Sequence, residues 1–227
     1  MIRPMTFYTA LEEISQSMEF PDSHLELLSD SRTMDFIEFL RVHFFPDENL
    51  SKSIGLKFDG EMARYLSVFY KQNLSVLLVD NKNNEIIASA GIGIFRKDQP
   101  ADSSQTTNKE WAQILAFLEH KSNEIDVYKY FNVDFTVGLS SLCTHRKYRH
   151  KGLATKTMQS AVLFAKKLGL GPVCIHIECT AIGSQKASEK LGFEIIQELR
   201  HDDYKIDGEI VFKNTDVKTT KCYAKQL

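Results

Sequence analysis

The sequence feature that most constrains the fold is a strand-like run that leads into a helix through Arg149-x-x-Gly152-x-Ala154. The N-terminus of a helix carries unpaired backbone N–H groups and the positive end of the helix dipole. Small residues at this turn let a phosphate group approach the backbone closely. The spacing therefore predicts a pyrophosphate cradle. Without further context, an ordinary strand-to-helix turn with solvated basic side chains is the simpler interpretation.

Two better-known phosphate motifs do not describe this turn. It is not a Walker motif, because Gly-Lys-Ser/Thr is absent. It is not a dinucleotide fingerprint either, because two of the three glycines of that fingerprint are missing. The basic run His145–Lys151 is short, and the chain has a net charge of -2, so a nucleic-acid surface is not expected here.

Hydrophobic spacing predicts strands that alternate with helices through the second half of the chain. The predicted strands are His24–Leu28, Ser75–Val79, Glu85–Phe95, Phe135–Thr144, Val173–Cys179, Phe193–Leu199 and Glu209–Phe212. The predicted helices are residues 31–45, Gly60–Gln72, Trp111–Asn123, Leu153–Leu168 and Ser184–Leu191. This order predicts an α/β fold with a mixed sheet.

The composition indicates one large domain. The chain has 227 residues, of which 43% are hydrophobic and 26% are charged, which suffices for one sizeable core. No linker rich in Pro, Gly or Ser divides it. We therefore expect a single domain over residues 21–227. An N-terminal extension over residues 1–20 precedes it and is either frayed or a short helix.

Charge and cysteine content limit the partners and the compartment. With a net charge of -2, nothing attracts the whole chain to nucleic acid or to anionic membrane. The cysteines form no C-x-x-C pair, so we expect neither a disulfide framework nor a metal site. Residues 1–20 lack the apolar core of a signal peptide, and no stretch reaches the ~20 apolar residues of a membrane span. We expect a soluble, cytoplasmic, monomeric protein.

Three consecutive features resemble the GNAT superfamily of N-acetyltransferases. Leu142–Lys156 resembles motif A of that superfamily. Ser184-Gln-Lys-Ala187-Ser-Glu-Lys-Leu-Gly192-Phe193 resembles motif B, in which a short helix ends in Leu-Gly-Phe. The predicted strand Val173–Cys179 lies between them, where that fold has one. The resemblance implies the GNAT acyltransferase fold, with a mixed central sheet covered by helices on both faces, and acetyl-CoA as cosubstrate.

Further motifs resemble the insect-type arylalkylamine (dopamine) N-acetyltransferases. His43–Leu50 is similar to their Phe-Phe-x-Asp-Glu-Pro-Leu stretch, and Asp126-Val127-Tyr128 also matches. Asp203-Tyr204-Lys205-x-x-Gly208-Glu209-x-Val211-Phe212 is the most family-specific motif, because GNAT proteins in general lack it. The resemblance implies a small arylalkylamine substrate such as dopamine, serotonin, tyramine or octopamine.

The resemblance also implies which residues bind the cofactor. The backbone of the fourth strand would pair with the pantetheine arm, and the amides of the turn would hold the pyrophosphate. Arg149, His150 and Lys151 would add positive charge for the phosphates. The implied cofactor-binding residues are Leu142, Cys143, Thr144, Arg149, His150, Lys151, Gly152, Leu153, Ala154, Thr155 and Ser184.

Glu48 occupies the position of the proposed general base of this family. A primary ammonium titrates near ~10, so a base must take its proton near neutral pH. Without the resemblance, Glu48 would be interpreted as a solvated loop acid. The oxyanion of the tetrahedral intermediate needs a backbone N–H from the fourth strand, for which Cys143 and Thr144 are the candidates.

The acid that protonates the leaving thiolate is less clearly indicated. Many GNAT enzymes have a tyrosine in motif B where this chain has Ser188. The insect-type family implies hydroxyls at Thr180 and Ser184 instead. Both residues are equally well explained as caps at the start of a helix. A free coenzyme A thiolate leaves readily, so the reaction does not require an acid.

Three further residues carry open alternatives. His176 is interpreted either as a proton relay or as a hydrogen-bonded structural histidine. Phe44 and Phe45 form either a wall of an aromatic amine pocket or part of the core. Cys143 as a nucleophile is disfavoured, because no adjacent base is evident.

Three functions remain distinguishable. The leading hypothesis is transfer of acetyl from acetyl-CoA to an arylalkylamine, with polyamine or agmatine acetylation as its variant. An aromatic pocket would favour arylalkylamines, and an acid-rich pocket would favour polyamines. The alternatives are a protein N-terminal or lysine acetyltransferase with an open peptide groove, and an acyl-CoA-binding module without catalysis, which has no use for Glu48.

Overall fold

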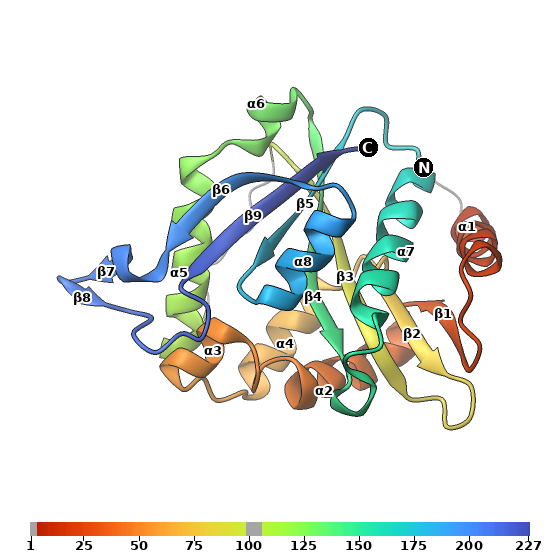
Figure 1. Cartoon of the computed structure of the whole chain (residues 1–227), viewed down its shortest axis with the longest axis horizontal. Coiled ribbons are helices and arrows are strands. Elements are labelled where there is room, and N and C mark those ends of the chain that lie inside the picture. The colour runs from red at the N-terminus through yellow and green to blue at the C-terminus, as the bar shows by residue number, and fades with distance from the viewer. Residues whose placement is uncertain (1–3, 99–105) are drawn as a thin grey trace.

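The computed structural model describes residues 4–98 and 106–227, and a seven-stranded mixed sheet forms its centre (Figure 1). The strands follow the order β1-β2-β3-β4-β5-β9-β6. Their bounds are Ser23–Leu27 (β1), Val76–Asp80 (β2), Ile86–Arg96 (β3), Phe135–Thr144 (β4), Cys174–Cys179 (β5), Thr219–Gln226 (β9) and Glu194–Arg200 (β6). β4 and β5 are parallel, and the other neighbours are antiparallel. The predicted α/β fold with a mixed sheet is confirmed.

Helices cover both faces of the sheet, as the family resemblance implied. One core contains residues of Pro4–Ser17 (α1), Leu153–Lys167 (α7) and Ile182–Lys190 (α8). The opposite core contains residues of Thr33–His43 (α2), Asn49–Ile54 (α3), Gly60–Phe69 (α4) and Lys109–Glu124 (α5). The short helix Val127–Phe131 (α6) precedes β4. In the described part of the chain, no helix has the length and apolarity needed to cross a membrane.

The N-terminal segment is a packed helix. Ala10, Leu11 and Ile14 of α1 are buried in the same core as α7, and the rings of Phe7 and Phe164 lie 5.8 Å apart. Residues 11 and 14 share one helical face, which explains how this short helix buries an apolar stripe. Of the two alternatives left open for residues 1–20, the described residues form the short helix.

The predicted closing strand Glu209–Phe212 is a strand only over its first two residues and does not belong to the main sheet. Glu209–Ile210 (β8) pairs only with Lys205–Ile206 (β7), in a small hairpin outside the main sheet. The seventh strand of the main sheet is β9, which lies between β5 and β6. Phe212 is instead fully buried against α5, where its ring lies 5.2 Å from that of Phe117. Apolar residues occur both in strands and in loops that place a side chain in a core. The apolar content of this segment therefore did not reveal that Phe212 lies outside the sheet.

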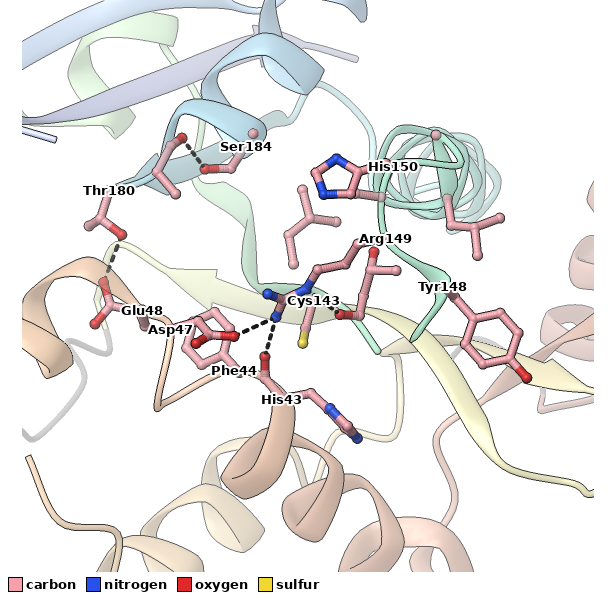
Figure 2. A pocket seen from close by; sticks show the side chains of 17 residues that line it. His43, Phe44, Asp47, Glu48, Cys143, Tyr148, Arg149, His150, Thr180 and Ser184 are labelled. Atoms are coloured by element: carbon pink, nitrogen blue, oxygen red, sulfur yellow. Dashed lines mark hydrogen bonds and ion pairs between the residues drawn. The ribbon is translucent and has the colours of Figure 1, made fainter. Parts of the chain in front are cut away.

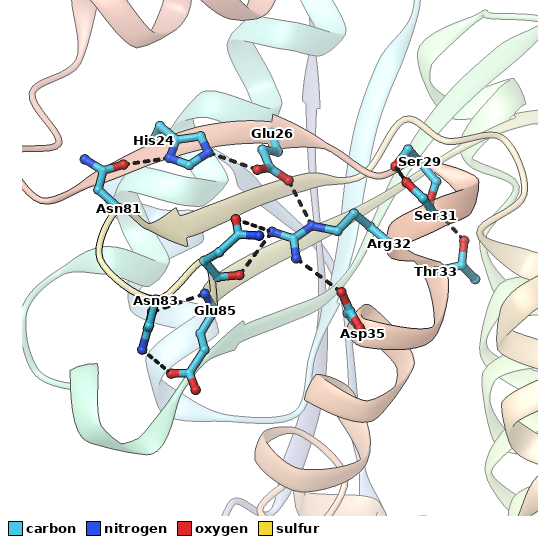
Figure 3. A network of polar contacts seen from close by, with 11 residues as sticks. His24, Glu26, Ser29, Ser31, Arg32, Thr33, Asp35, Asn81, Asn83 and Glu85 are labelled. Atoms are coloured by element: carbon cyan, nitrogen blue, oxygen red, sulfur yellow. Dashed lines mark hydrogen bonds and ion pairs between the residues drawn. The ribbon is translucent and has the colours of Figure 1, made fainter.

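A polar network joins the β2–β3 hairpin to the start of α2 (Figure 3). Arg32 lies in the 3-10 turn before α2 and donates to Glu26 of β1 at 3.1 Å, to Asp35 at 3.2 Å and to the Asn84 carbonyl at 3.2 Å. One guanidinium therefore connects β1, the hairpin turn and the start of α2.

The two parallel strands at the centre of the sheet separate. β4 pairs with β5 from Thr136 to Leu139, but β4 continues to Thr144 and β5 to Cys179 without further pairing between them. The end of β4 therefore leaves one edge of its backbone open toward β5. The turn to α7 follows directly after this open segment.

Candidate active site

A cavity of about 360 Å³ lies at the gap between β4 and β5 (Figure 2). Its walls come from the loop after α2, the end of β4, the turn to α7 and the start of α8. Nearly all of the predicted cofactor-binding residues line it. They are Leu142, Cys143, Thr144, Arg149, His150, Gly152, Leu153, Ala154 and Ser184. Lys151 and Thr155 are not among the lining residues.

The N-terminus of α7 opens toward this cavity. Its N-cap is Gly152, which has a φ of +74°, and no side chain caps the helix. The first backbone N–H groups of an uncapped helix are available to an anion. A side chain at position 152 would have to adopt a left-handed backbone that non-glycine residues rarely tolerate. The turn thus has the shape and polarity that a diphosphate needs.

The end of β4 presents backbone N–H groups to the gap. The N–H of His145 donates to Ile87 at 2.9 Å, and Cys143 lies opposite Ser89. Because antiparallel pairs alternate, the N–H of Cys143 points at β3 and that of Thr144 points away from it. Ser89 donates to the carbonyl of Ser141 at 3.0 Å, which turns the N–H of the next residue toward the gap. Of the two oxyanion candidates, Thr144 therefore directs its N–H toward the gap, whereas the N–H of Cys143 faces β3.

Glu48 lies at the inner end of the cavity and is more than a solvated acid. It is half-buried and is the N-cap of α3, a helix that is not among those predicted from the sequence. Its carboxylate accepts hydrogen bonds from Leu50 N–H at 3.0 Å and from Ser51 N–H at 2.7 Å. The hydroxyls of Ser51 and Thr180 donate to it at 2.6 and 2.7 Å. These four donors hold the carboxylate in one orientation. The sequence signal for helix α3 was Gly55, the residue at which this helix ends.

A second cavity of about 180 Å³ meets the first at three shared lining residues, Phe44, Glu48 and Thr180. Its walls are largely aromatic and aliphatic. The aromatic members are Phe44, Phe45, Tyr65, Phe69, Tyr70 and Trp111, and the aliphatic ones are Leu50, Leu66, Ile114, Leu115 and Leu118. Phe45 lines this cavity and is also buried in the core. Because α4 and α5 supply most of these walls, no local motif could have identified them.

Arg149 connects the two halves of the site instead of reaching freely into it (Figure 2). Its guanidinium pairs with Asp47 at 2.8 Å and donates to the carbonyls of His43 at 3.0 Å and Thr144 at 3.2 Å. Arg146 also donates to Asp47 at 3.0 Å. Hydrogen bonds from Arg146 and then Arg149 lower the pKa of Asp47. Asp47 therefore shares its single negative charge between Arg146 and Arg149, and the guanidinium of Arg149 is held against the loop after α2.

The two hydroxyls at the start of α8 are not helix caps. The N-cap of α8 is Ala181, and no side chain caps this helix. Thr180 donates to Glu48, while Ser184 donates back to the Ala181 carbonyl at 2.9 Å. Both residues line the first cavity, and Thr180 also lines the second cavity. The alternative that these residues start the helix as caps is wrong.

Other candidates lie outside the chemistry. Burial raises the pKa of the Cys143 thiol to about 12, so this thiol is a poor nucleophile. Ser188 is fully buried and donates to the Ser184 carbonyl at 3.0 Å. His176 lines neither cavity. In the described residues it forms one possible metal-ligand group with Glu178 and Cys222, whose ligand atoms lie within 4.8 Å of one another, away from both cavities.

Comparison with known proteins agrees with this geometry. The chain matches the Acetyltransferase (GNAT) family over residues 34–193. Arylalkylamine N-acetyltransferase 2 from Aedes aegypti is 24% identical, with a TM-score of 0.81 over 89% of this chain and 98% of that one. Mosquito arylalkylamine N-acetyltransferase like 5b is also 24% identical, with a TM-score of 0.82 over 90% and 100%.

A third similar structure is the Drosophila melanogaster polyamine N-acetyltransferase that forms N-acetylagmatine. It is 19% identical, with a TM-score of 0.80 over 91% of this chain and 100% of that one. At such identities, the three structures demonstrate a shared fold alone. The family match, however, spans well over half of the chain and includes the splayed strands and the anion-binding turn. The chain therefore belongs to the acetyltransferase (GNAT) family, whose members use acetyl-CoA as cosubstrate.

Proposed function

We propose that the chain acetylates the primary amine of a small arylalkylamine, such as dopamine, serotonin, tyramine or octopamine, with Glu48 as general base. The observation that carries the proposal is the aromatic cavity that meets the first cavity, which we call the cofactor cavity, at Glu48. An aromatic ring fits such walls, and the amine then lies beside the carboxylate. We call the aromatic cavity the amine cavity below.

The lining of the amine cavity favours arylalkylamines over polyamines. Glu48 is the only carboxylate among its described lining residues. A polyamine or agmatine carries a second cation, whose burial in an apolar cavity costs free energy unless a carboxylate accompanies it. The small volume of about 180 Å³ also suits one compact amine better than a peptide chain.

Acetyl transfer requires the following proton and bond changes. The ammonium first gives a proton to the Glu48 carboxylate, and the neutral nitrogen attacks the thioester carbonyl carbon. The C–S bond then breaks as the amide C–N bond is completed. The nitrogen loses its second proton, and the departing thiolate takes up one proton. General-base catalysis of this kind contributes roughly 10²–10⁴-fold to the rate.

The cofactor-binding roles follow from the open backbone. The N–H groups of Leu142 and Thr144 point to the gap and would hold the pantetheine arm and the thioester oxygen. The uncapped start of α7, over Gly152, Leu153 and Ala154, would hold the diphosphate. His150, Lys151 and Thr155 remain candidates for outer phosphate contacts.

The roles of the hydroxyls and of Arg149 change accordingly. Thr180 is a positioning residue that holds Glu48, and Ser184 contacts the cofactor from the start of α8. Arg149 positions the loop that carries Asp47 and Glu48 through its bonds to Asp47 and His43. Because Ser188 is buried, the thiolate leaves without a motif B acid.

A thiol-release screen tests the proposal. Purified protein with acetyl-CoA is offered tyramine, dopamine, serotonin, agmatine, spermidine and short peptides, and free coenzyme A is measured. We expect the highest kcat/KM with the aryl amines. Faster turnover of agmatine or spermidine would replace arylalkylamines with polyamines as the substrate class. Turnover of peptides alone would overturn the small-amine assignment.

A further inference from the structure

Three hydroxyl groups meet at one side of the amine cavity. The Tyr70 hydroxyl lies 3.0 Å from Ser140 Oγ and 2.7 Å from Ser141 Oγ. All three residues line the amine cavity, and none of them lines the cofactor cavity. We call these three residues the hydroxyl cluster. In a cavity with otherwise largely apolar walls, such a cluster offers hydrogen bonds to a polar group of the bound amine.

The backbone is distorted at the position where the cluster forms. Consecutive residues of a strand normally point to opposite faces of a sheet. Ser140 and Ser141 nevertheless both reach Tyr70, because the register shifts at a bulge and Ser141 has a φ of +44°. Ser89 holds this conformation by donating to the Ser141 carbonyl at 3.0 Å. A left-handed non-glycine residue is strained, and such strain is concentrated at functional sites.

Gly91 on the neighbouring strand makes room for the cluster. A Cβ atom at this position would lie 2.7 Å from Ser140 Oγ and 2.7 Å from Cε1 of Tyr70. No side chain other than hydrogen fits there without displacing one of them. Strands β3 and β4 are thus both shaped around the same three hydroxyls.

The cluster lies next to the proposed reaction centre. Leu142, which directly follows Ser141, points its N–H into the gap where the thioester oxygen would bind. One residue of a strand spans only about 3.3 Å, so Ser140 and Ser141 lie within one or two residues of the N–H that would hold the thioester oxygen. Glu48 and the cluster line the same small cavity, so both can contact the nitrogen that attacks the thioester.

From this geometry we propose that the hydroxyl cluster accepts a hydrogen bond from the second N–H of the amine and thereby selects primary over secondary amines. The inference rests on the proposed small-amine activity. The three hydroxyls carry three protons, and the two hydrogen bonds within the cluster use two of these protons. Because each hydroxyl oxygen has two lone pairs, lone pairs remain that can accept an N–H of the ligand. One N–H then faces Glu48 and another faces the cluster, which aims the nitrogen lone pair at the carbonyl carbon. A secondary amine replaces one N–H with an alkyl group and loses this bond.

The test compares matched primary and N-methylated amines. The ratio of kcat/KM for tyramine to that for N-methyltyramine is measured in the wild type, in Tyr70→Phe and in Ser140→Ala. We expect the ratio to fall by about two- to tenfold in each variant, which corresponds to the loss of one neutral hydrogen bond. The KM for acetyl-CoA should stay unchanged, because the cluster does not line the cofactor cavity.

A matched control removes a hydroxyl that lies outside the cavity. Ser67 lies on α4 with Tyr65 and Phe69, and its hydroxyl donates only to the Ala63 carbonyl at 2.8 Å in the described structure. Ser67→Ala should keep the wild-type ratio, and an equal fall in this variant would attribute the effect to a loosened helix and overturn the inference. So would an unchanged ratio in both cluster variants.

The same experiment separates this inference from the proposed function. If the wild type turns over a diamine but no aryl amine, putrescine and N,N'-dimethylputrescine, in which both amines are secondary, replace the tyramine pair. The arylalkylamine assignment then fails, while the selection for primary amines is still measured. If the wild type turns over no primary amine at all, the proposed function is overturned and this inference with it.

Discussion

At the scale of single residues, Glu48 has two tasks that depend on each other. Its carboxylate caps α3 through the N–H groups of Leu50 and Ser51, and it faces both cavities. Thr180 donates to the Oε1 atom from the far end of β5. A base held by several donors does not have to search for its orientation during catalysis, which reduces the entropic cost of the reaction.

Replacing Glu48 with glutamine should therefore impair catalysis more than binding. Glu48→Gln keeps the size of the side chain and removes the proton acceptor. We expect kcat with tyramine to fall by roughly 10²–10⁴-fold, while the KM for acetyl-CoA changes little. Glu38→Gln, which changes an exposed carboxylate that pairs with Arg41 on α2, serves as the control and should retain full activity. A kcat of Glu48→Gln within threefold of the wild type, by initial-rate thiol release, would refute the general-base assignment.

At the scale of elements, an ion-pair group connects the exit of α2 to the turn before α7. Asp47 receives Arg146 from one side and Arg149 from the other, and Arg149 also holds carbonyls of both segments. The segments that carry the proposed base and the anion-binding turn are thus joined directly. Side-chain exposures of 35% to 48% show that solvent screens these pairs, so their role is mainly geometric.

The stabilisation from Asp47 should depend on pH. Because Arg146 and Arg149 lower its pKa in the folded state, its contribution is complete above the unfolded value near ~3.9. This contribution is lost as the pH falls through the folded pKa. Asp47→Asn should lower the free energy of unfolding by less than about 1 kcal/mol at pH 7, and the difference from the wild type should vanish at lower pH. Urea unfolding at pH 7, 5 and 3 measures it, and a constant difference would contradict the ion-pair explanation.

At the scale of the whole molecule, two cores on opposite faces of one sheet hold the site between them. The amine cavity opens within the core that contains α4 and α5, and the cofactor turn starts α7 on the other face. α1 covers the outer side of α7, and Ile14 has an exposure of only 2%. The N-terminal segment therefore supports the helix whose N-terminus faces the cofactor cavity.

Truncating the buried face of α1 should destabilise the fold. Ile14→Ala removes a fully buried aliphatic side chain and should lower the free energy of unfolding by about 2–5 kcal/mol. Tyr8→Ala, at a position of 61% exposure on the same helix, is the control and should change it by less than about 0.5 kcal/mol. Equilibrium denaturation measures both. Equal effects for the two variants would mean that residues 1–20 are an extension without a packing role.

The sequence alone determined the elements whose signals are local. The resemblance of contiguous motifs to a family implied Glu48 and the cofactor-binding residues. The turn Arg149-x-x-Gly152-x-Ala154 and the alternating strands and helices are themselves local patterns, because periodicity and helix-start chemistry act over a few residues. Together, the resemblance and these patterns sufficed to predict the mixed sheet and most of the residues that line the cofactor cavity.

Only the tertiary structure decided which distant residues meet. Thr180 reaches Glu48 across 132 positions, β9 inserts between β5 and β6, and Tyr70 joins two serines of β4 over a bulge. Arg149, expected to add charge for the phosphates, also pairs with Asp47, which lies 102 positions earlier in the chain. Strand order and side-chain packing determine these contacts. Both depend on burial summed over the whole chain, and a short stretch of sequence holds no information about that sum.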